Sequence, residues 1–413
     1  MIKSKKSRAH NVLLNFFGLI IPLIVGVFSI PYVIRGLGVE SFGILSLAWM
    51  ILTYLTFFDL GLGRAATKFI AERLKIGSIT DLQELFWTAS CINFVIGCVI
   101  GLIVAWLTPF FAEKIFHISP ELIGKTKIVF YILAGSCPML FVSTTFRGAL
   151  EAAQRFEYIN IVVVISNSLT FLLPVIGLLF GFDLRGIVLL LMIAKVCSVI
   201  VYLIINFKVF PSLINNMSFN FNIAVRLFSF GGWVSISNVV SPIMTYLDRF
   251  IIGSVISVTA VAYYTAPYEM ITKLWILPTS LTLTLFPSFG SVLTIEQANL
   301  AGLYSRSVKI LFLMIAPVVA ILILFANDIL TLWLGLNFAS MSTAVFQILA
   351  IGILLNSLAQ IPYALIQGLG RPDITAKCHL FELILYVPLV WFLVARMGIV
   401  GGALAWSTRA MLD

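Results

Sequence analysis

Long apolar stretches alternate with short polar segments along the whole chain. Residues 9–34 contain no Asp, Glu, Lys or Arg, and the same holds for 85–112, 158–182, 227–247 and 329–370. A helix needs about 20 apolar residues to cross the hydrocarbon core of a bilayer, whereas the strands of a membrane barrel would be shorter and alternating. The pattern therefore predicts an all-α, polytopic membrane protein.

The apolar stretches define eleven spans and the beginning of a twelfth. We place the spans at 12–34, 42–60, 85–108, 125–146, 159–180, 186–206, 227–247, 256–288, 308–326, 341–366 and 377–396. A further stretch begins near Gly398 and reaches Asp413, which is short for a comfortable crossing. We therefore expect this last helix to be truncated and the chain to be a fragment.

Twelve spans divide naturally after the sixth. The sequence predicts an N-terminal six-helix bundle over 1–207, a cytoplasmic linker over 208–226 and a C-terminal bundle over 227–413. Six crossings return the chain to its starting side, so the two bundles would share one orientation, related by an axis along the membrane normal. A faint repeat agrees, because 149–155 (ALEAAQR) is similar in outline to 364–371 (ALIQGLGR), each after the fourth span of its half.

Composition and charge fit a chain dissolved in lipid. Hydrophobic residues make up 61% and charged residues 10%, against about 45–50% and about 25% in soluble domains. Lys and Arg are more frequent in the loops on the N-terminal side than in the opposite loops, which by the positive-inside rule predicts a cytoplasmic N-terminus. Topology also explains the net charge of +9, so we expect no nucleic-acid partner.

The segments outside the spans and the cysteines give little indication of a soluble catalytic domain. The segment 64–75 (RAATKFIAERLK) spaces its charges as a short helix on the cytoplasmic surface would, with a solvated connector as the alternative. The five cysteines show no Cys-x-x-Cys spacing, which argues against disulfides and metal and favours packing. No phosphate-binding loop of the G-x-x-x-x-G-K-[ST] type is present, so ATP hydrolysis is not expected.

Four segments resemble the oligosaccharide flippases of bacterial polysaccharide synthesis. They are 39–45 (VESFGIL), 58–64 (FDLGLGR), 147–155 (RGALEAAQR) and, most strongly, 246–288 (YLDRFIIGSVISVTAVAYYTAPYEMITKLWILPTSLTLTLFPS). Together they touch both halves, so the similarity covers essentially the whole chain. These flippases are the O-antigen and exopolysaccharide repeat-unit transporters of the multidrug/oligosaccharidyl-lipid/polysaccharide exporter superfamily.

The resemblance implies a specific function. Two six-helix bundles would surround a central cavity and move a polyprenyl-pyrophosphate-linked oligosaccharide from the cytoplasmic to the outer leaflet of the bacterial inner membrane by alternating access. The product would serve surface polysaccharide such as lipopolysaccharide. The implied protein is a monomer and not an enzyme, with no cofactor beyond proton or sodium coupling. Its implied partners are the lipid-linked oligosaccharide, membrane lipids, and a polymerase and chain-length regulator of the same pathway.

Charged residues within spans are the first candidates for contacts with such a substrate. Each costs roughly 2.5–3.5 kcal/mol near the bilayer centre, so it usually faces a cavity or a partner. Glu269 and Lys273 share one face of the eighth span at i and i+4. Either they form a self-neutralising pair, or Lys273 contacts phosphate while Glu269 sets its charge or accepts a proton. Lys195, in the sixth span, either contacts the substrate or snorkels or pairs.

Charged residues at span ends form a second set. Asp248 and Arg249 follow the seventh span and Arg35 the first, which suggests an outer gate or a pyrophosphate exit site, with capped helix ends as the alternative. Asp59 and Arg64 bracket a Gly-Leu-Gly turn at the cytoplasmic end of the second span, where we expect the incoming headgroup. For sugars, the aromatic and amide candidates are Tyr54, Tyr263, Tyr264, Tyr268, Asn356 and Gln360.

Two other functions compete with the flippase. A cation-coupled multidrug exporter of the same superfamily is disfavoured, because many such exporters carry a carboxylate in the first span and residues 9–34 have none. A membrane glycosyltransferase or polymerase usually presents sizeable outer loops with acidic or His residues. The outer loops here are short, and His10, His117 and His379 do not cluster in the sequence.

Overall fold

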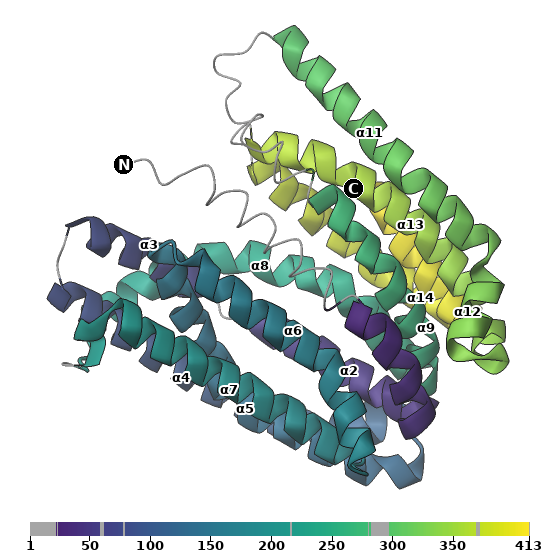
Figure 1. Cartoon of the computed structure of the whole chain (residues 1–413), viewed down its shortest axis with the longest axis horizontal. Helices are drawn as coiled ribbons and strands as arrows, with labels where there is room; N and C mark the ends of the chain where they lie inside the picture. The colour runs from purple at the N-terminus through teal and green to yellow at the C-terminus, as the bar shows by residue number, and fades with distance from the viewer. Residues whose placement is uncertain are drawn as a thin grey trace. The chain divides into compact units, whose positions relative to one another are not determined.

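Helices make up almost all of the described chain, and no strand occurs within the described residues (Figure 1). A computed structural model describes residues 22, 24–57, 62–76, 79–214, 217–279, 281, 297–368 and 372–412. After a first helix at Ile24–Leu37 come α2 (Val39–Phe57), α3 (Leu62–Ile76), α4 (Ile79–Phe110), α5 (Pro120–Ala152), α6 (Phe156–Leu179), α7 (Leu184–Val209), α8 (Phe221–Val255), α9 (Val258–Ile271), α11 (Gln297–Leu324), α12 (Ala326–Leu334), α13 (Leu336–Gly368) and α14 (Pro372–Leu412). The all-α prediction is confirmed.

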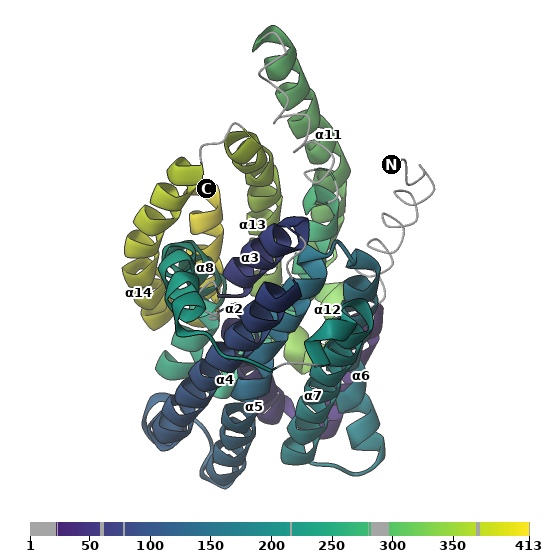
Figure 2. The ribbon, with the colours of Figure 1, turned by 90° about the vertical axis from the view of Figure 1, so that its left-hand side faces the viewer.

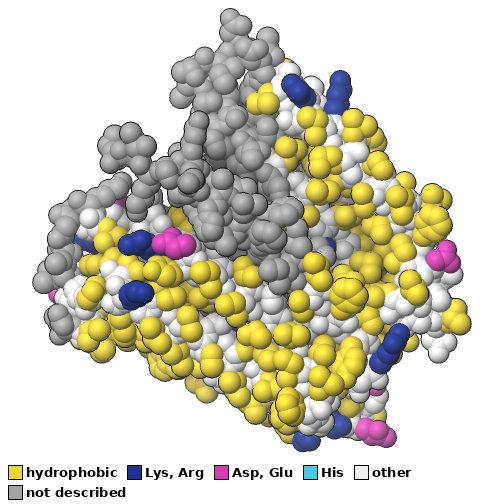
Figure 3. Space-filling view, viewed as in Figure 1, with side chains coloured by type: hydrophobic (Ala, Val, Ile, Leu, Met, Phe, Trp, Pro, Cys, Tyr) yellow, Lys and Arg dark blue, Asp and Glu magenta, His cyan; other side chains and the backbone are white. Residues whose placement is uncertain are grey.

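Seven of the described helices are long and apolar enough to cross a membrane. They are Asp81–Ile115, Pro120–Ala152, Phe156–Leu179, Leu184–Val209, Ala301–Leu324, Leu336–Ile366 and Lys377–Leu412, with shorter apolar helices at Ile24–Leu37 and Val39–Thr53. Hydrophobic side chains cover most of the described surface in view, with charged ones mainly near helix ends (Figure 3). Water would not tolerate apolar surface on this scale, so the predicted polytopic membrane protein is confirmed.

The chain separates into two compact units, Met1–Pro242 and Ile243–Asp413. In the first unit, α5 packs against α2, α3, α4, α6 and α7, and the helices α4 to α7 run side by side (Figures 1 and 2). In the second unit, α13 packs against α9, α11, α12 and α14. Among the spans, α5 and α13 accordingly have the largest buried share, with 56% and 50% of the residues in their apolar 18-residue segments buried. These helices are the fourth spans of the two predicted halves. The cytoplasmic linker predicted between the halves at 208–226 stays a prediction.

Small residues set the closest helix contact of the first unit. Gly97 and Gly101 lie one turn apart on α4 and face α5. A Cβ atom at Gly97 would lie 2.5 Å from the Cα of Pro138, and one at Gly101 would lie 2.5 Å from the carbonyl oxygen of Ala134. The pair is therefore a small-xxx-small contact, which lets two backbones approach where side chains would hold them apart.

The predicted surface segment 64–75 is a helix, α3. Its buried residues are Leu62, Ala65, Ala66 and Ile70, which pack into the core shared with α4 and α5. Arg64, Lys68 and Glu72 are exposed on its other side. The helical reading of this segment is confirmed over the solvated connector.

Three further features refine the predicted spans. The backbone of α14 leaves helical geometry at Gly398, with φ 63° and ψ −141°, which confirms a new helix beginning there. A short helix that the sequence did not suggest, α12, joins the ninth and tenth spans. In the eighth span, α9 ends at Ile271 and the chain tightens into a 3₁₀ turn at Thr272–Trp275.

A capped turn joins α6 to α7. The Asp183 carboxylate accepts hydrogen bonds from the backbone N–H groups of Arg185 and Gly186, both at 3.2 Å, and an ion pair from the Arg185 side chain at 2.7 Å. Partial burial opposes ionisation, but the Gly186 N–H and Arg185 outweigh it and lower the pKa of Asp183 below its ordinary value of 3.8. Asp183 thus starts α7.

Candidate functional site

The charged residues predicted in the seventh and eighth spans meet within the second unit. Glu269 on α9 bridges two cations: its Oε1 lies 3.4 Å from Nη2 of Arg249 on α8, and its Oε2 lies 3.2 Å from Nζ of Lys273. Glu269 and Lys273 share one face, as their i, i+4 spacing predicted, and they form an ion pair. The sequence did not show that Arg249 belongs to the same chain of ion pairs.

Asp248 and Tyr264 form a second buried pair beside the first. The Tyr264 hydroxyl donates a hydrogen bond to Oδ2 of Asp248, and the backbone N–H of Arg249 donates to Oδ1 at 2.8 Å. Both side chains are fully buried. A buried carboxylate needs such donors because desolvation without them is costly.

Aromatic rings enclose the two arginines of this region. The guanidinium carbon of Arg249 lies 4.4 Å from the ring centroid of Tyr268 and 5.0 Å from that of Tyr246. Arg409 on α14 lies 5.6 Å from the Tyr386 ring and 5.8 Å from the Trp406 ring. Cation–π contacts stabilise a guanidinium removed from water. Arg409 also interacts electrostatically with Asp248, so it belongs to the same network.

This buried charge network, defined as Asp248, Arg249, Glu269, Lys273 and Arg409, carries an excess of positive charge. Three cations face two carboxylates, which leaves a net charge of +1 if all are ionised. Arg249 is only 2% exposed, whereas the Lys273 side chain is 29% exposed. Lys273 is therefore the most accessible cation of the chain of ion pairs, and the residues behind it hold it in place.

One of the alternative readings of these residues is wrong. Asp248 and Arg249 do not cap a helix end, because α8 continues to Val255 and both side chains are buried. The sequence placed the end of the seventh span at 247, since Asp248 and Arg249 are charged. Because Tyr264 binds Asp248 and Glu269 pairs with Arg249, both buried charges have partners, and the helix continues past them.

Three other predicted site residues are described in the first unit. Arg35 is exposed near the end of the helix Ile24–Leu37, and Arg64 is exposed on α3. Lys195 on α7 donates a hydrogen bond to Oγ of Ser166 on α6 at 3.1 Å. Asp59 lies outside the described residues.

The residues predicted to contact sugars lie in different environments. Tyr264 and Tyr268 are buried in the charge network rather than open to a ligand. Asn356 accepts a hydrogen bond from the Trp275 indole N–H at 2.9 Å. The side chain of Tyr54 lies outside the described ones. Within the described residues, no group of His, Cys, Asp and Glu is arranged to hold a metal ion.

Solved structures place this fold among membrane transporters. The lipid II flippase MurJ in an inward closed conformation is similar with a TM-score of 0.81 at 14% sequence identity, over 98% of this chain and 85% of that one. An inward-facing multidrug resistance MATE family transporter of the MOP superfamily is similar with a TM-score of 0.80 at 16% identity, over 96% and 94%. At these identities the likeness concerns the fold.

Sequence comparison identifies the family. Residues 9–293 match the family of polysaccharide biosynthesis proteins. A putative O-antigen transporter of Shigella flexneri is 32% identical over 416 residues, which cover 98% of this chain and 95% of the relative. The chain therefore belongs to the polysaccharide biosynthesis protein family, as the resemblance of its motifs predicted.

Proposed function

We propose that this protein translocates a lipid-linked oligosaccharide across a bacterial inner membrane for surface polysaccharide synthesis. The transported lipid would carry a polyprenyl pyrophosphate, and movement would run from the cytoplasmic to the outer leaflet with the N-terminus in the cytoplasm. The family match and the similarity to the O-antigen transporter support this proposal.

The single observation that carries the proposal is the buried charge network with its excess cation. Each hydroxyl stripped of water without a partner costs about 4–8 kcal/mol on the cyclohexane scale, so a sugar chain cannot cross lipid unaided. A pyrophosphate, being charged, meets a higher barrier still. Lys273 offers a positive charge within a span, and Glu269 and Arg249 fix its position. Ammonium groups bind phosphate oxygens by charge-assisted hydrogen bonds, so Lys273 is our proposed contact.

The other candidate residues would make additional contacts with the substrate. Arg35 and Arg64 are exposed and suit contacts with a headgroup near the ends of the path. Lys195 would contribute a polar contact within the first unit. Coupling to a proton or sodium ion would act through Glu269, the carboxylate shared by two cations.

Two other functions remain as alternatives. A cation-coupled multidrug exporter shares the fold, since a MATE family transporter is among the similar structures. The excess of positive charge in the network favours an anionic substrate over the cationic drugs that such an exporter would carry. A membrane glycosyltransferase or polymerase has less support, because its relatives here are named as transporters and flippases.

Complementation tests the proposal. In a bacterium whose own repeat-unit flippase is deleted and replaced by this chain, we expect surface polysaccharide to return and lipid-linked repeat units in the inner leaflet to fall. Lys273→Ala should reduce the restored polysaccharide at least tenfold at equal protein abundance. Lys309→Ala, which removes an exposed lysine of α11, serves as the matched control.

The outcome also separates the alternatives. If the wild-type chain leaves polysaccharide absent but lowers the intracellular level of a cationic dye, the exporter reading replaces the flippase. If purified protein elongates a sugar chain, the enzyme reading replaces both.

A further inference from the structure

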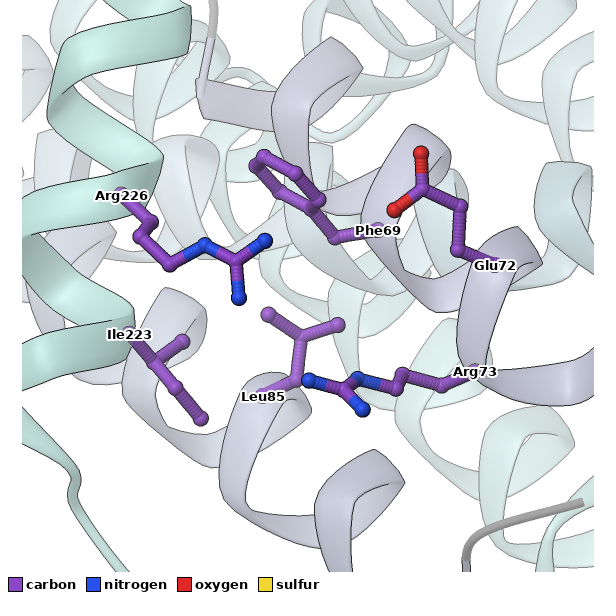
Figure 4. Close-up of a pocket in the computed structure, with 6 residues that line it drawn as sticks. All are labelled: Phe69, Glu72, Arg73, Leu85, Ile223 and Arg226. Carbon is purple, nitrogen blue, oxygen red and sulfur yellow. The ribbon is translucent and has the colours of Figure 1, made fainter. Parts of the chain in front are cut away.

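The charges of the pocket in the first unit are balanced. This pocket lies where α3, α4 and α8 meet, and Arg73 and Arg226 line it together with Glu72 (Figure 4). Asp81 forms an ion pair with Arg73 at 2.6 Å. Two guanidinium groups thus face two carboxylates, so the pocket offers no excess charge to a ligand. The second unit, by contrast, presents aromatic and amide side chains that are only partly buried within its spans.

Trp275 ends the 3₁₀ turn of the eighth span, and three contacts fix the plane of its ring. Its indole N–H donates a hydrogen bond to Oδ1 of Asn356 on α13 at 2.9 Å. Its ring centroid lies 6.5 Å from that of Tyr268, edge to face, and 6.3 Å from that of Trp406, at a tilt of 46°. A ring held in this way has lost its freedom to turn before a ligand arrives, so binding to it costs less entropy.

The aromatic cluster is closed behind Trp275 but not around it. Tyr268 and Trp406 are only 3% and 0% exposed, whereas Trp275 is partly exposed. The indole is therefore held from within the second unit by buried partners and remains accessible from outside the cluster. A rigid aromatic surface of this kind suits a ligand with an apolar face.

A polar amide lies one helical turn from the residue that holds the indole. Gln360 follows Asn356 at i+4, so both side chains lie on the side of α13 that meets Trp275. Gln360 is partly exposed and makes no hydrogen bond within the described part of the chain. An amide offers two donors and one acceptor oxygen, which are costly to leave unused at membrane depth. The amide of Gln360 is thus available to a polar ligand.

Lys273 lies two residues before Trp275 in the same turn. A 3₁₀ helix has three residues per turn, so these two side chains leave it in directions about 120° apart. They would therefore contact different parts of one ligand rather than the same group. A glycosyl pyrophosphate has such a two-part chemistry, because its phosphates are anionic and the attached sugar ring combines an apolar C–H face with hydroxyl groups at its rim.

We infer that Trp275 and Gln360 form a sugar subsite, in which the C–H face of a sugar ring stacks on the indole and Gln360 hydrogen-bonds to a ring hydroxyl. Asn356 is the positioning residue that holds the indole. The inference rests on the proposed function and deepens it, because it names the sugar attached to the pyrophosphate as the group recognised here. Trp275 thereby takes the place of the buried Tyr264 and Tyr268 as the aromatic sugar contact.

Binding of two lipids by the purified full-length protein tests the inference. One is undecaprenyl pyrophosphate, and the other is the lipid-linked repeat unit extracted from the flippase-deleted strain used for complementation. We expect the wild type to bind the glycosylated lipid more tightly than the bare one. Trp275→Leu should lower the affinity for the glycosylated lipid about tenfold, since stacking is lost, and leave the bare lipid unchanged. Trp275→Phe keeps an aromatic face and should retain part of the preference, whereas Lys273→Ala should weaken both lipids alike.

Gln360→Leu guards against misfolding as an explanation. It removes no hydrogen bond within the described residues, so the native structure should persist. The affinity for the glycosylated lipid should fall about fivefold, as the loss of one neutral hydrogen bond would cause, while the bare lipid binds as before. Trp391→Leu, which removes a 58% exposed indole of α14, is the matched control and should change neither affinity.

Two results would overturn the inference. One is equal affinity of the wild type, Trp275→Leu and Gln360→Leu for the glycosylated lipid. The other is a parallel loss of both lipids in Trp275→Leu with no change in Gln360→Leu, because the indole would then only support the fold. A wild type that binds neither lipid would instead refute the proposed function, and the subsite with it, so the two failures are distinguishable.

Discussion

Arg249 and Glu269, twenty positions apart in the chain, form an ion pair in which Nη2 lies 3.4 Å from Oε1. The arginine is almost fully buried, and the carboxylate also binds Lys273. Burying an ion pair costs desolvation energy that the attraction between the charges only partly returns. The arrangement is therefore better explained by a need for charge at this position than by stability.

Removing the shared carboxylate should destabilise the protein more than removing either cation. Glu269→Gln leaves Arg249 and Lys273 without their bridge, and the loss of one partner of a buried pair costs about 3–5 kcal/mol. Arg249→Met leaves Glu269 paired with Lys273, so it should cost less. Lys273→Gln affects a partly exposed pair and should cost at most about 1 kcal/mol. Thermal unfolding in detergent measures this order.

The double variant Arg249→Met with Glu269→Gln is the control for this series. It removes the buried charges together and should recover part of the stability that Glu269→Gln loses. If Glu269→Gln unfolds at the same temperature as the wild type, the ion pairs contribute nothing to the native state and this interpretation fails.

The hydrogen bond from Tyr264 to Asp248 provides a second prediction. Tyr264→Phe leaves a fully buried carboxylate without one of its donors, which should cost about 1–3 kcal/mol. Tyr263→Phe is the matched control, because Tyr263, the neighbour of Tyr264 on α9, is only partly buried. This substitution should change stability by less than about 0.5 kcal/mol. Equal unfolding temperatures for the two variants would show that the hydrogen bond is not formed.

Close packing of α4 on α5 gives a third prediction. Gly101→Ala would place a Cβ atom 2.5 Å from the Ala134 carbonyl oxygen, so the helices must separate, at a cost of about 1–3 kcal/mol. Gly135→Ala on α5 meets nothing within 4 Å and should stabilise the helix by about 0.5–1 kcal/mol. Opposite shifts in unfolding temperature are expected, and a tolerated Gly101→Ala would disprove the contact.

The cap of α7 gives a prediction about pH. The pKa of Asp183 is lowered in the folded protein, so its charge contributes stability above the ordinary value of 3.8, and this contribution is lost as the pH falls through the folded pKa. The side chain is partly exposed, so the contribution is only about 0.3 kcal/mol after screening. Asp183→Asn keeps the cap and removes the charge. Its difference from wild type at pH 7 should shrink as the pH falls below 3.8 and vanish once Asp183 is protonated in the folded protein; a difference that does not change with pH would exclude a charge effect.

The helices could largely be predicted from the sequence, because charge-free stretches of spanning length are hard to place anywhere except in lipid. The spacing of Arg64, Lys68 and Glu72 likewise indicated the surface helix α3. The end of the seventh span was misplaced because Asp248 and Arg249 are charged, and local hydropathy carries no information about partners supplied by α9. The short helix α12 was missed because its apolar residues continue those of the neighbouring spans.

The site could be predicted only where its residues are close in sequence. Glu269 and Lys273 are one helical turn apart, so their pairing was visible. Arg249 joins Glu269, and Arg409 joins Asp248, only because tertiary packing brings α8, α9 and α14 together. An arginine within an apolar span was the one available signal for Arg409. Such an isolated cation usually has a partner in a membrane protein, but its sequence does not name that partner.

The most direct test of the central claim is the movement of a lipid-linked oligosaccharide in vesicles that contain only this purified protein. The sugar would be labelled in one leaflet and its exposure on the other leaflet followed with a membrane-impermeant oxidant. We predict that the wild type exposes the sugar, that Lys309→Ala matches the wild type, and that Lys273→Ala slows the exposure at least tenfold. Exposure at the same rate in protein-free vesicles and in vesicles with the wild type would contradict the account.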